Sequence, residues 1–189
     1  MLDSCSPYQL IPVQKSSPGK TNADSFDEAY IYKFFTEGTA KYQRLKYIIR
    51  VEKYDNAFAL KFYAARDRKN DNKYHRIINA YGYRGLVRLL LTCLQVMPDI
   101  LNKFPKASFV VNGANSIDSS KRVAEEIGNS QRFRIYNEFI LRKISDKKFA
   151  HFYSKNSSSI MLVNRSSTDD VNAEADRLRN YLLDIYDFD

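Results

Sequence analysis

Five residues in the first half of the chain have the types and the spacing that phosphate binding requires. Arg44, Lys46, Arg50 and Lys61 are cationic, and Tyr63 follows two residues after the last of them. Alternate side chains of a strand point to the same side, so these residues are expected to share one face of two neighbouring strands. Rows of cations about 5 Å apart can meet successive phosphates, and a tyrosine can stack on a base. The spacing predicts a surface for nucleic acid or another polyanion, and a solvated sheet face is the alternative.

A second candidate is the turn "AYGYRGLV" at residues 80–87. Gly82 and Gly85 stand three residues apart, between an expected strand and the start of an expected helix. Such a turn can present backbone N–H groups and the positive end of a helix to a phosphate, and Arg84 adds a positive charge. A tight turn that needs glycine conformations explains the same residues.

No metal site is expected. The two histidines, His75 and His151, and the two cysteines, Cys5 and Cys93, do not form the closely spaced set that zinc requires. The cysteines do not form a disulfide framework either. We find no basic start followed by an apolar stretch, and no apolar run near the roughly 18 residues of a membrane span. These features predict a cytoplasmic protein that does not enter a membrane.

Charge is distributed unevenly along the 189 residues, which carry a net charge of +8. Residues 31–165 hold 26 Lys and Arg against 11 Asp and Glu, whereas residues 1–30 and 166–189 are net acidic. A basic middle part favours an anionic partner, which would be nucleic acid, a phosphorylated cofactor or an acidic protein.

The alternation of apolar and polar residues predicts the elements that position these candidates. In residues 42–53, Tyr47, Ile49 and Val51 share one face, which is typical of a half-buried strand. Residues 85–105 are apolar nearly all round, which indicates a buried helix with a kink at Pro98. We expect strands at 29–35, 42–53, 57–66, 74–81, 107–113, 149–154 and 158–165, and helices at 85–105, 121–128, 130–144 and 169–188.

With the helices at 121–128 and 130–144 counted as one helical segment, this order, β-β-β-β-α-β-α-β-β-α, predicts an α+β fold with a mostly antiparallel, twisted sheet. Residues 1–28 are rich in Ser, Pro, Asp and Asn without a period, so we expect a flexible N-terminal arm followed by a single domain over 29–189. In the helix at 130–144, Phe133, Tyr136 and Ile140 are expected to face inward, with Arg132 and Arg142 nearer to solvent.

The layout from about Ala29 to Arg165 resembles the C-terminal part of GNAT-type acyltransferases. The residues that carry the resemblance are the turn "YGYRGLV", the strand "ASFVVNGAN" and the helix "SQRFRIYNEFI". The second helix of that family often has an Asn, an Arg-Ala pair and a Tyr, and Asn129, Arg132, Phe133 and Tyr136 fall in comparable places. The chain is also similar, more loosely, to small uncharacterised bacterial domains with an "RxRxY"-like helix, which "RFRIY" matches.

The GNAT resemblance implies an N-acyltransferase that uses acetyl-CoA or another acyl-CoA. Gly82, Arg84 and Gly85 would then hold the pyrophosphate of the cofactor, and Tyr136 would protonate its departing thiolate. The family turn reads Arg/Gln-x-x-Gly-x-Gly/Ala, whereas here Gly82 and Val87 stand at its first and last positions. Three hypotheses follow: a non-enzymatic basic domain that binds nucleic acid or another polyanion without a cofactor, a GNAT-like acyltransferase, and a structural or interaction protein.

Overall fold

The computed structural model describes residues 5–16, 26–38, 43–76, 82–113, 117–118, 123–125 and 128–185. Its central element is a seven-stranded sheet in the order β1-β2-β3-β4-β5-β9-β8, in which β4 and β5 run parallel and the other neighbours antiparallel. The strands are β1 (Ile11–Ser16), β2 (Glu28–Phe35), β3 (Lys46–Tyr54), β4 (Ala57–Ala64), β5 (Ser108–Asn112), β8 (Phe149–Ser154) and β9 (Ser159–Asn164), with a separate hairpin of β6 (Ile117–Asp118) and β7 (Val123–Ala124). The helices are η2 (Ala65–Asp67), α1 (Gly82–Leu94), α2 (Val96–Lys103), α3 (Gln131–Lys143) and α4 (Val171–Ile185). The predicted α+β class with a mostly antiparallel sheet is confirmed.

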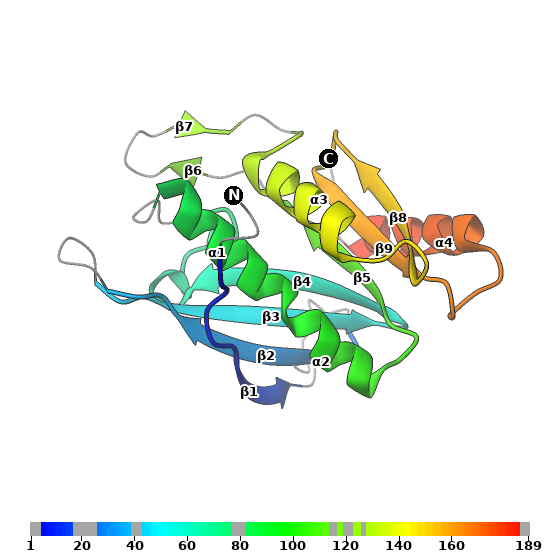
Figure 1. Cartoon of the computed structure of the whole chain (residues 1–189), viewed down its shortest axis with the longest axis horizontal. Helices are drawn as coiled ribbons and strands as arrows, with labels where there is room; N and C mark the ends of the chain where they lie inside the picture. The colour runs from blue at the N-terminus through cyan, green and yellow to red at the C-terminus, as the bar shows by residue number, and fades with distance from the viewer. Residues whose placement is uncertain are drawn as a thin grey trace.

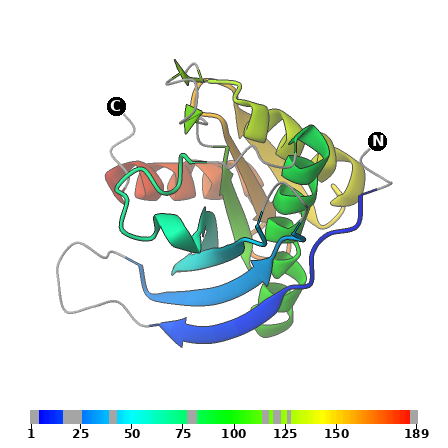
Figure 2. The same cartoon turned by 90° about the vertical axis from the view of Figure 1, so that its left-hand side faces the viewer.

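Helices pack on both faces of the sheet, but unevenly. Helices α1, α2 and α3 cover one side, which we call the inner face, and α4 lies on the opposite side, the outer face (Figure 1). Helix α4 packs against β8 and β9, through Ala175 on Ala150 and Val163. Helix α4 also reaches the end of β3, where the rings of Tyr54 and Tyr181 meet edge to face with 6.2 Å between their centroids. The part of the outer face formed by β2 and the start of β3 lies away from α4 (Figure 2).

The main core lies between the inner face and its three helices, and alternation decides which strand residues enter it. In β3, Tyr47, Ile49 and Val51 are fully buried in this core, whereas Ile48 and Arg50 are half-buried on the outer face. Because side chains of a strand alternate between faces, the predicted pattern of this strand is confirmed.

The N-terminal segment that the sequence predicts as an arm contributes to the fold over its described residues, 5–16. Strand β1 pairs antiparallel with β2 at the edge of the sheet. The ring of Tyr8 stacks on Phe34 with 5.6 Å between the centroids, and its backbone N–H donates to Thr92 Oγ1 at 2.9 Å. The folded domain therefore begins before residue 29, because a few apolar side chains of this polar segment pack against the core.

Two expected elements differ from the structure. Residues 71–75 form turns where a strand over 74–81 is expected, and residues 77–81 lie outside the described residues. Val123–Ala124 pairs with Ile117–Asp118 as a hairpin where a helix over 121–128 is expected. Local helix propensity is a weak preference that pairing with another segment can override.

The expected helix over 85–105 is present as two helices, α1 and α2, with the break at Gln95. Pro98 explains the break, because it has no N–H to donate to the carbonyl of Leu94 and its ring crowds that carbonyl. Within the described part of the chain, Gly82–Lys103 is the one segment long and apolar enough to span a membrane, yet 61% of its most apolar window is buried inside the protein. The segment is thus accounted for as core.

A hydrogen bond between β2 and α2 gives a testable dependence of stability on pH. The Tyr32 hydroxyl donates to Asp99 Oδ2 at 2.5 Å, and Lys103 Nζ lies 3.0 Å from the same oxygen. The Tyr32 hydrogen bond, followed by Lys103, holds the pKa of Asp99 below its ordinary value of 3.8. The resulting stabilisation is complete above pH 3.8 and is lost as the pH falls through the lower pKa of the folded state.

We expect this acid-range loss to be about 1 kcal/mol, because the carboxylate is partly exposed and screened. Urea unfolding of the native chain and of Asp99→Asn, measured across the acid range, gives the comparison. The variant should be less stable at neutral pH by that amount and should approach the native chain in acid. A constant difference at every pH would contradict the assignment.

Candidate functional site

Six cationic side chains gather on the outer face of β2, β3 and β4 and on the segments that precede β3 and follow β4. The pairing register places Arg50 opposite Lys61 and aligns Lys33 with Tyr63 through β3. Residues opposite one another in a sheet project to the same side, so these groups lie together. We call this set the basic face: Lys33, Arg44, Lys46, Arg50, Lys61 and Lys73.

Glu52 is the carboxylate at the centre of this face. Its side chain is 7% exposed and lies 2.7 Å from Arg50 Nε and 2.5 Å from Lys61 Nζ. The Tyr54 hydroxyl donates to Glu52 Oε2 at 2.8 Å. A buried carboxylate needs such partners, since its desolvation is otherwise costly. One negative charge faces two positive charges, so the group of Arg50, Glu52 and Lys61 keeps a net positive charge.

Aromatic rings accompany the cations. The rings of Tyr63 and Tyr74 meet edge to face at 5.6 Å, and Lys73 Nζ lies 5.6 Å and 5.3 Å from their centroids. In the segment before β3, the Arg44 guanidinium lies 4.4 Å from the centre of the Phe35 ring. These cation–π contacts hold charged groups beside flat apolar surfaces, which is the combination that stacking on bases and pairing with phosphates requires.

The five residues that the sequence singles out for polyanion binding therefore lie on one face of the sheet. Arg44 and Lys46 are exposed, and Arg50, Lys61 and Tyr63 are partly exposed. Lys33 and Lys73 are not among the residues that the sequence indicated. The alternation within β2 could have indicated Lys33, whereas Lys73 belongs to an irregular segment and is placed only by tertiary contacts.

The residues implied by the GNAT resemblance lie in α1 and α3. Gly82 begins α1 with a φ of 60°, Arg84 is exposed in the first turn, and Gly85 is partly buried within the helix. Tyr136 is 2% exposed in the core. Its hydroxyl is hydrogen-bonded to the Cys93 thiol, and burial raises the pKa of Tyr136 well above its ordinary value. In this arrangement the phenol faces a core thiol, away from the exposed start of α1.

Helix α3 corrects one expectation. Tyr136, Phe133 and Ile140 face inward as predicted and Arg142 is exposed, but Arg132 is only 1% exposed. Arg132 precedes Tyr136 by four residues and therefore lies on the same side of the helix.

The buried guanidinium of Arg132 is held by contacts from outside its own helix. Its Nη1 donates to the backbone oxygen of Tyr74 at 2.6 Å, and the group lies 5.1 Å from the centre of the Phe62 ring. Burial lowers the pKa of this arginine. Arg132 thus joins α3 to the segment after β4 and does not contribute to an exposed basic edge.

The candidate functional residues thus fall into two groups in the structure. Cations, rings and one buried carboxylate share the outer face of β2, β3 and β4, while the predicted acyl-CoA residues are divided between an exposed helix start and the core. Comparisons of this chain with family models, with curated proteins and with solved structures gave no match.

Proposed function

We propose that this protein binds single-stranded nucleic acid along the basic face, without catalysing a reaction. The observation that carries the proposal is that cations from separate segments of the chain gather on one partly open sheet face. Neighbouring strands are about 5 Å apart, so the cations are spread over a distance that several phosphates of one chain can occupy. A single small anion would need them to converge on one point.

The rings favour a single strand over a duplex. Tyr63, Tyr74 and Phe35 lie among the cations, and every base of a single strand has a free face that can stack on such a ring. In a duplex the bases are already stacked on one another, and sequence readout requires an element that enters a groove. A sheet face with half-buried rings is better suited to unpaired bases.

The direct test is the binding of a fluorescently labelled single-stranded oligonucleotide, measured by anisotropy over a series of salt concentrations. Each phosphate contact is expected to contribute about −0.7 to the slope of log K against log salt. Three to four contacts from the six cations give a slope of about −2 to −3. The corresponding duplex should bind more weakly at each salt concentration.

Polyglutamate is the control, because it offers the charge of an acidic protein without bases. If polyglutamate competes as strongly as the unlabelled oligonucleotide, the basic face recognises negative charge alone. An acidic protein would then be the preferred partner. An absence of oligonucleotide binding in low salt would overturn the proposal.

Two further proposals come from the sequence resemblance to GNAT-type acyltransferases: a GNAT-like arrangement of elements, and acyl transfer from an acyl-CoA. Their support is the start of α1 at Gly82 and the motif that includes Tyr136. The burial of Tyr136 beside Cys93 gives acyl transfer no further support. A cytoplasmic location likewise remains a prediction from the cysteine content and the hydropathy of the chain.

A further inference from the structure

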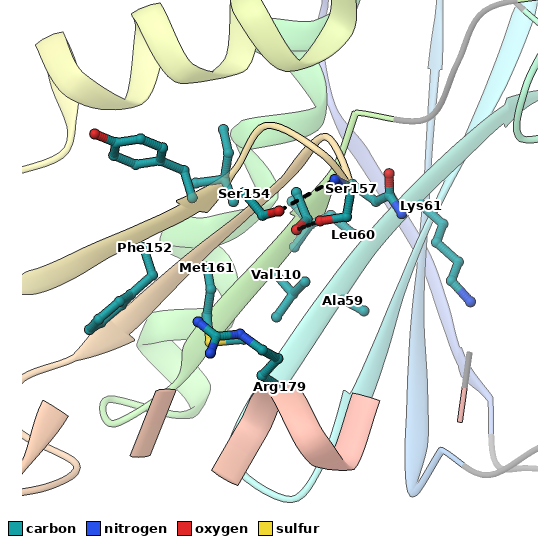
Figure 3. Close-up of a pocket in the computed structure, with 13 residues that line it drawn as sticks. Ala59, Leu60, Lys61, Val110, Phe152, Ser154, Ser157, Met161 and Arg179 are labelled. Carbon is teal, nitrogen blue, oxygen red and sulfur yellow. Dashed lines mark hydrogen bonds between the residues drawn. The ribbon is translucent and has the colours of Figure 1, made fainter. Parts of the chain in front are cut away.

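A cavity of about 290 Å³ opens on the outer face of the sheet beside the basic face. Its floor is a row of apolar side chains across four adjacent strands: Ala59 is paired with Val110, Val110 with Met161, and Met161 with Phe152. Figure 3 shows these four side chains in sequence across the sheet. The floor is therefore an apolar strip, against which the face of a planar ring can pack.

A second, polar row runs beside the apolar one. Asn112 is paired with Ser159, and Ser159 with Ser154, each two residues along its strand from a residue of the apolar row. Side chains two residues apart in a strand share a face, so both rows line the cavity. An amide and two hydroxyls can each donate and accept hydrogen bonds. The cavity thus offers an apolar surface with a polar border along one side.

Cationic groups lie at two sides of the cavity. Lys61 belongs to both the cavity and the basic face. Arg179 reaches the cavity from α4 (Figure 3), and its guanidinium lies 2.7 Å from Asp176 at the exposed surface. A ligand with a flat apolar body, a hydrogen-bonding edge and an attached negative charge matches these features.

We propose that this cavity receives one base of the nucleic-acid strand bound on the basic face. The base lies on the strip from Ala59 to Phe152 with its edge at Asn112 and the serines, and its phosphate is directed to the side of the cavity at Lys61, which adjoins the basic face. The volume is at the lower end of the range for small-molecule sites, which suits one nucleotide. This inference rests on the proposed function, since the shared Lys61 connects the two surfaces.

The consequence is a preference among bases that the basic face alone would not produce. Contacts to phosphates carry no sequence information, whereas hydrogen bonds to a base edge distinguish bases whose donors and acceptors differ. The four nucleoside 5′-monophosphates are therefore suitable probes, because each presents one base and one phosphate. We expect one of them to bind more tightly than the others.

The test uses Met161→Trp, which fills the cavity, and Leu141→Trp as its matched control. Leu141 is 58% exposed on α3, on the other side of the sheet. The nucleotides are titrated against each protein by NMR, and oligonucleotide affinity is measured by anisotropy. Met161→Trp should abolish nucleotide binding and reduce oligonucleotide affinity at least about fivefold, because the contacts of one base are lost, while the salt slope stays unchanged. Leu141→Trp should behave as the native chain does.

The outcomes separate this inference from the proposed function. If oligonucleotide binding depends on salt but is equal in the native chain and in Met161→Trp, the inference that the cavity holds a base is overturned. The basic face then remains the binding surface. Failure of every monophosphate to bind the native chain also overturns the pocket. In a third outcome, the native chain binds a nucleotide, Met161→Trp does not, and neither protein binds oligonucleotides. This result overturns the proposed function, and with it the inference that the cavity holds one base of a bound strand.

Discussion

Replacing both Arg44 and Lys46 by glutamate is expected to weaken the binding of single-stranded nucleic acid on the order of a hundredfold in low salt. Both side chains are exposed, and the structure shows no ion pair for either among the described residues. Their replacement therefore removes positive charge from the face without disturbing a buried partner. Anisotropy titration in low salt measures the loss.

The matched control is the double variant Lys106→Glu and Lys147→Glu, which makes the same change in net charge. Both lysines are exposed and lie near the start of β5 and of β8, at the opposite end of the strands from Lys46. The control should lose much less affinity. An equal loss in the two double variants would mean that net charge, and not the basic face, governs binding.

Arg50 and Lys61 are less suitable for this experiment, although the sequence indicates them equally. Both hold the buried carboxylate of Glu52. Removing either would leave that carboxylate with fewer partners, and such a change destabilises the folded state. A loss of binding in those variants would combine a local effect on the face with an effect on folding.

Gly113→Ala is expected to lower the free energy of unfolding by about 3 kcal/mol, at the upper end of the range for overpacked sites. A Cβ atom at this position would lie 2.5 Å from the backbone nitrogen of Phe133. The end of β5 is also fixed to two neighbours: Gly113 N–H donates to Ser158 O at 2.8 Å in the turn between β8 and β9, and the Gly113 carbonyl accepts from the hydroxyl of Ser130 at the start of α3. Relief of the clash would disturb these bonds, and urea unfolding measures the cost.

Gly82→Ala is the control for this glycine substitution. A Cβ at Gly82 has open space around it, and the cost there comes only from the positive φ of 60°, which is about 1 to 2 kcal/mol. Gly113→Ala should therefore be the less stable of the two variants. Surface changes without structural consequence usually alter the free energy of unfolding by less than about 0.5 kcal/mol. If Gly113→Ala differs from the native chain by no more than this, β5 and α3 do not approach so closely.

The sequence by itself determined the features that depend on local periodicity. The alternation around Tyr47, Ile49 and Val51 predicted both the buried side of β3 and, by exclusion, the side that carries Arg50. The long apolar run predicted a core helix, and the class α+β followed from the order of such segments. Four residues of the basic face, Arg44, Lys46, Arg50 and Lys61, could be identified because a strand has only two faces, and the buried one was evident.

The tertiary structure alone decided the features that join distant segments. Arg132 is buried because the segment containing Tyr74 and the ring of Phe62 surround it, and nothing in the local spacing distinguishes it from an exposed arginine. The cavity is formed by pairing β4 with β5, β5 with β9 and β9 with β8. Local periodicity tells which face of a strand is buried, but strand order and register depend on long-range packing, so the rows that line this cavity exist only in the folded sheet.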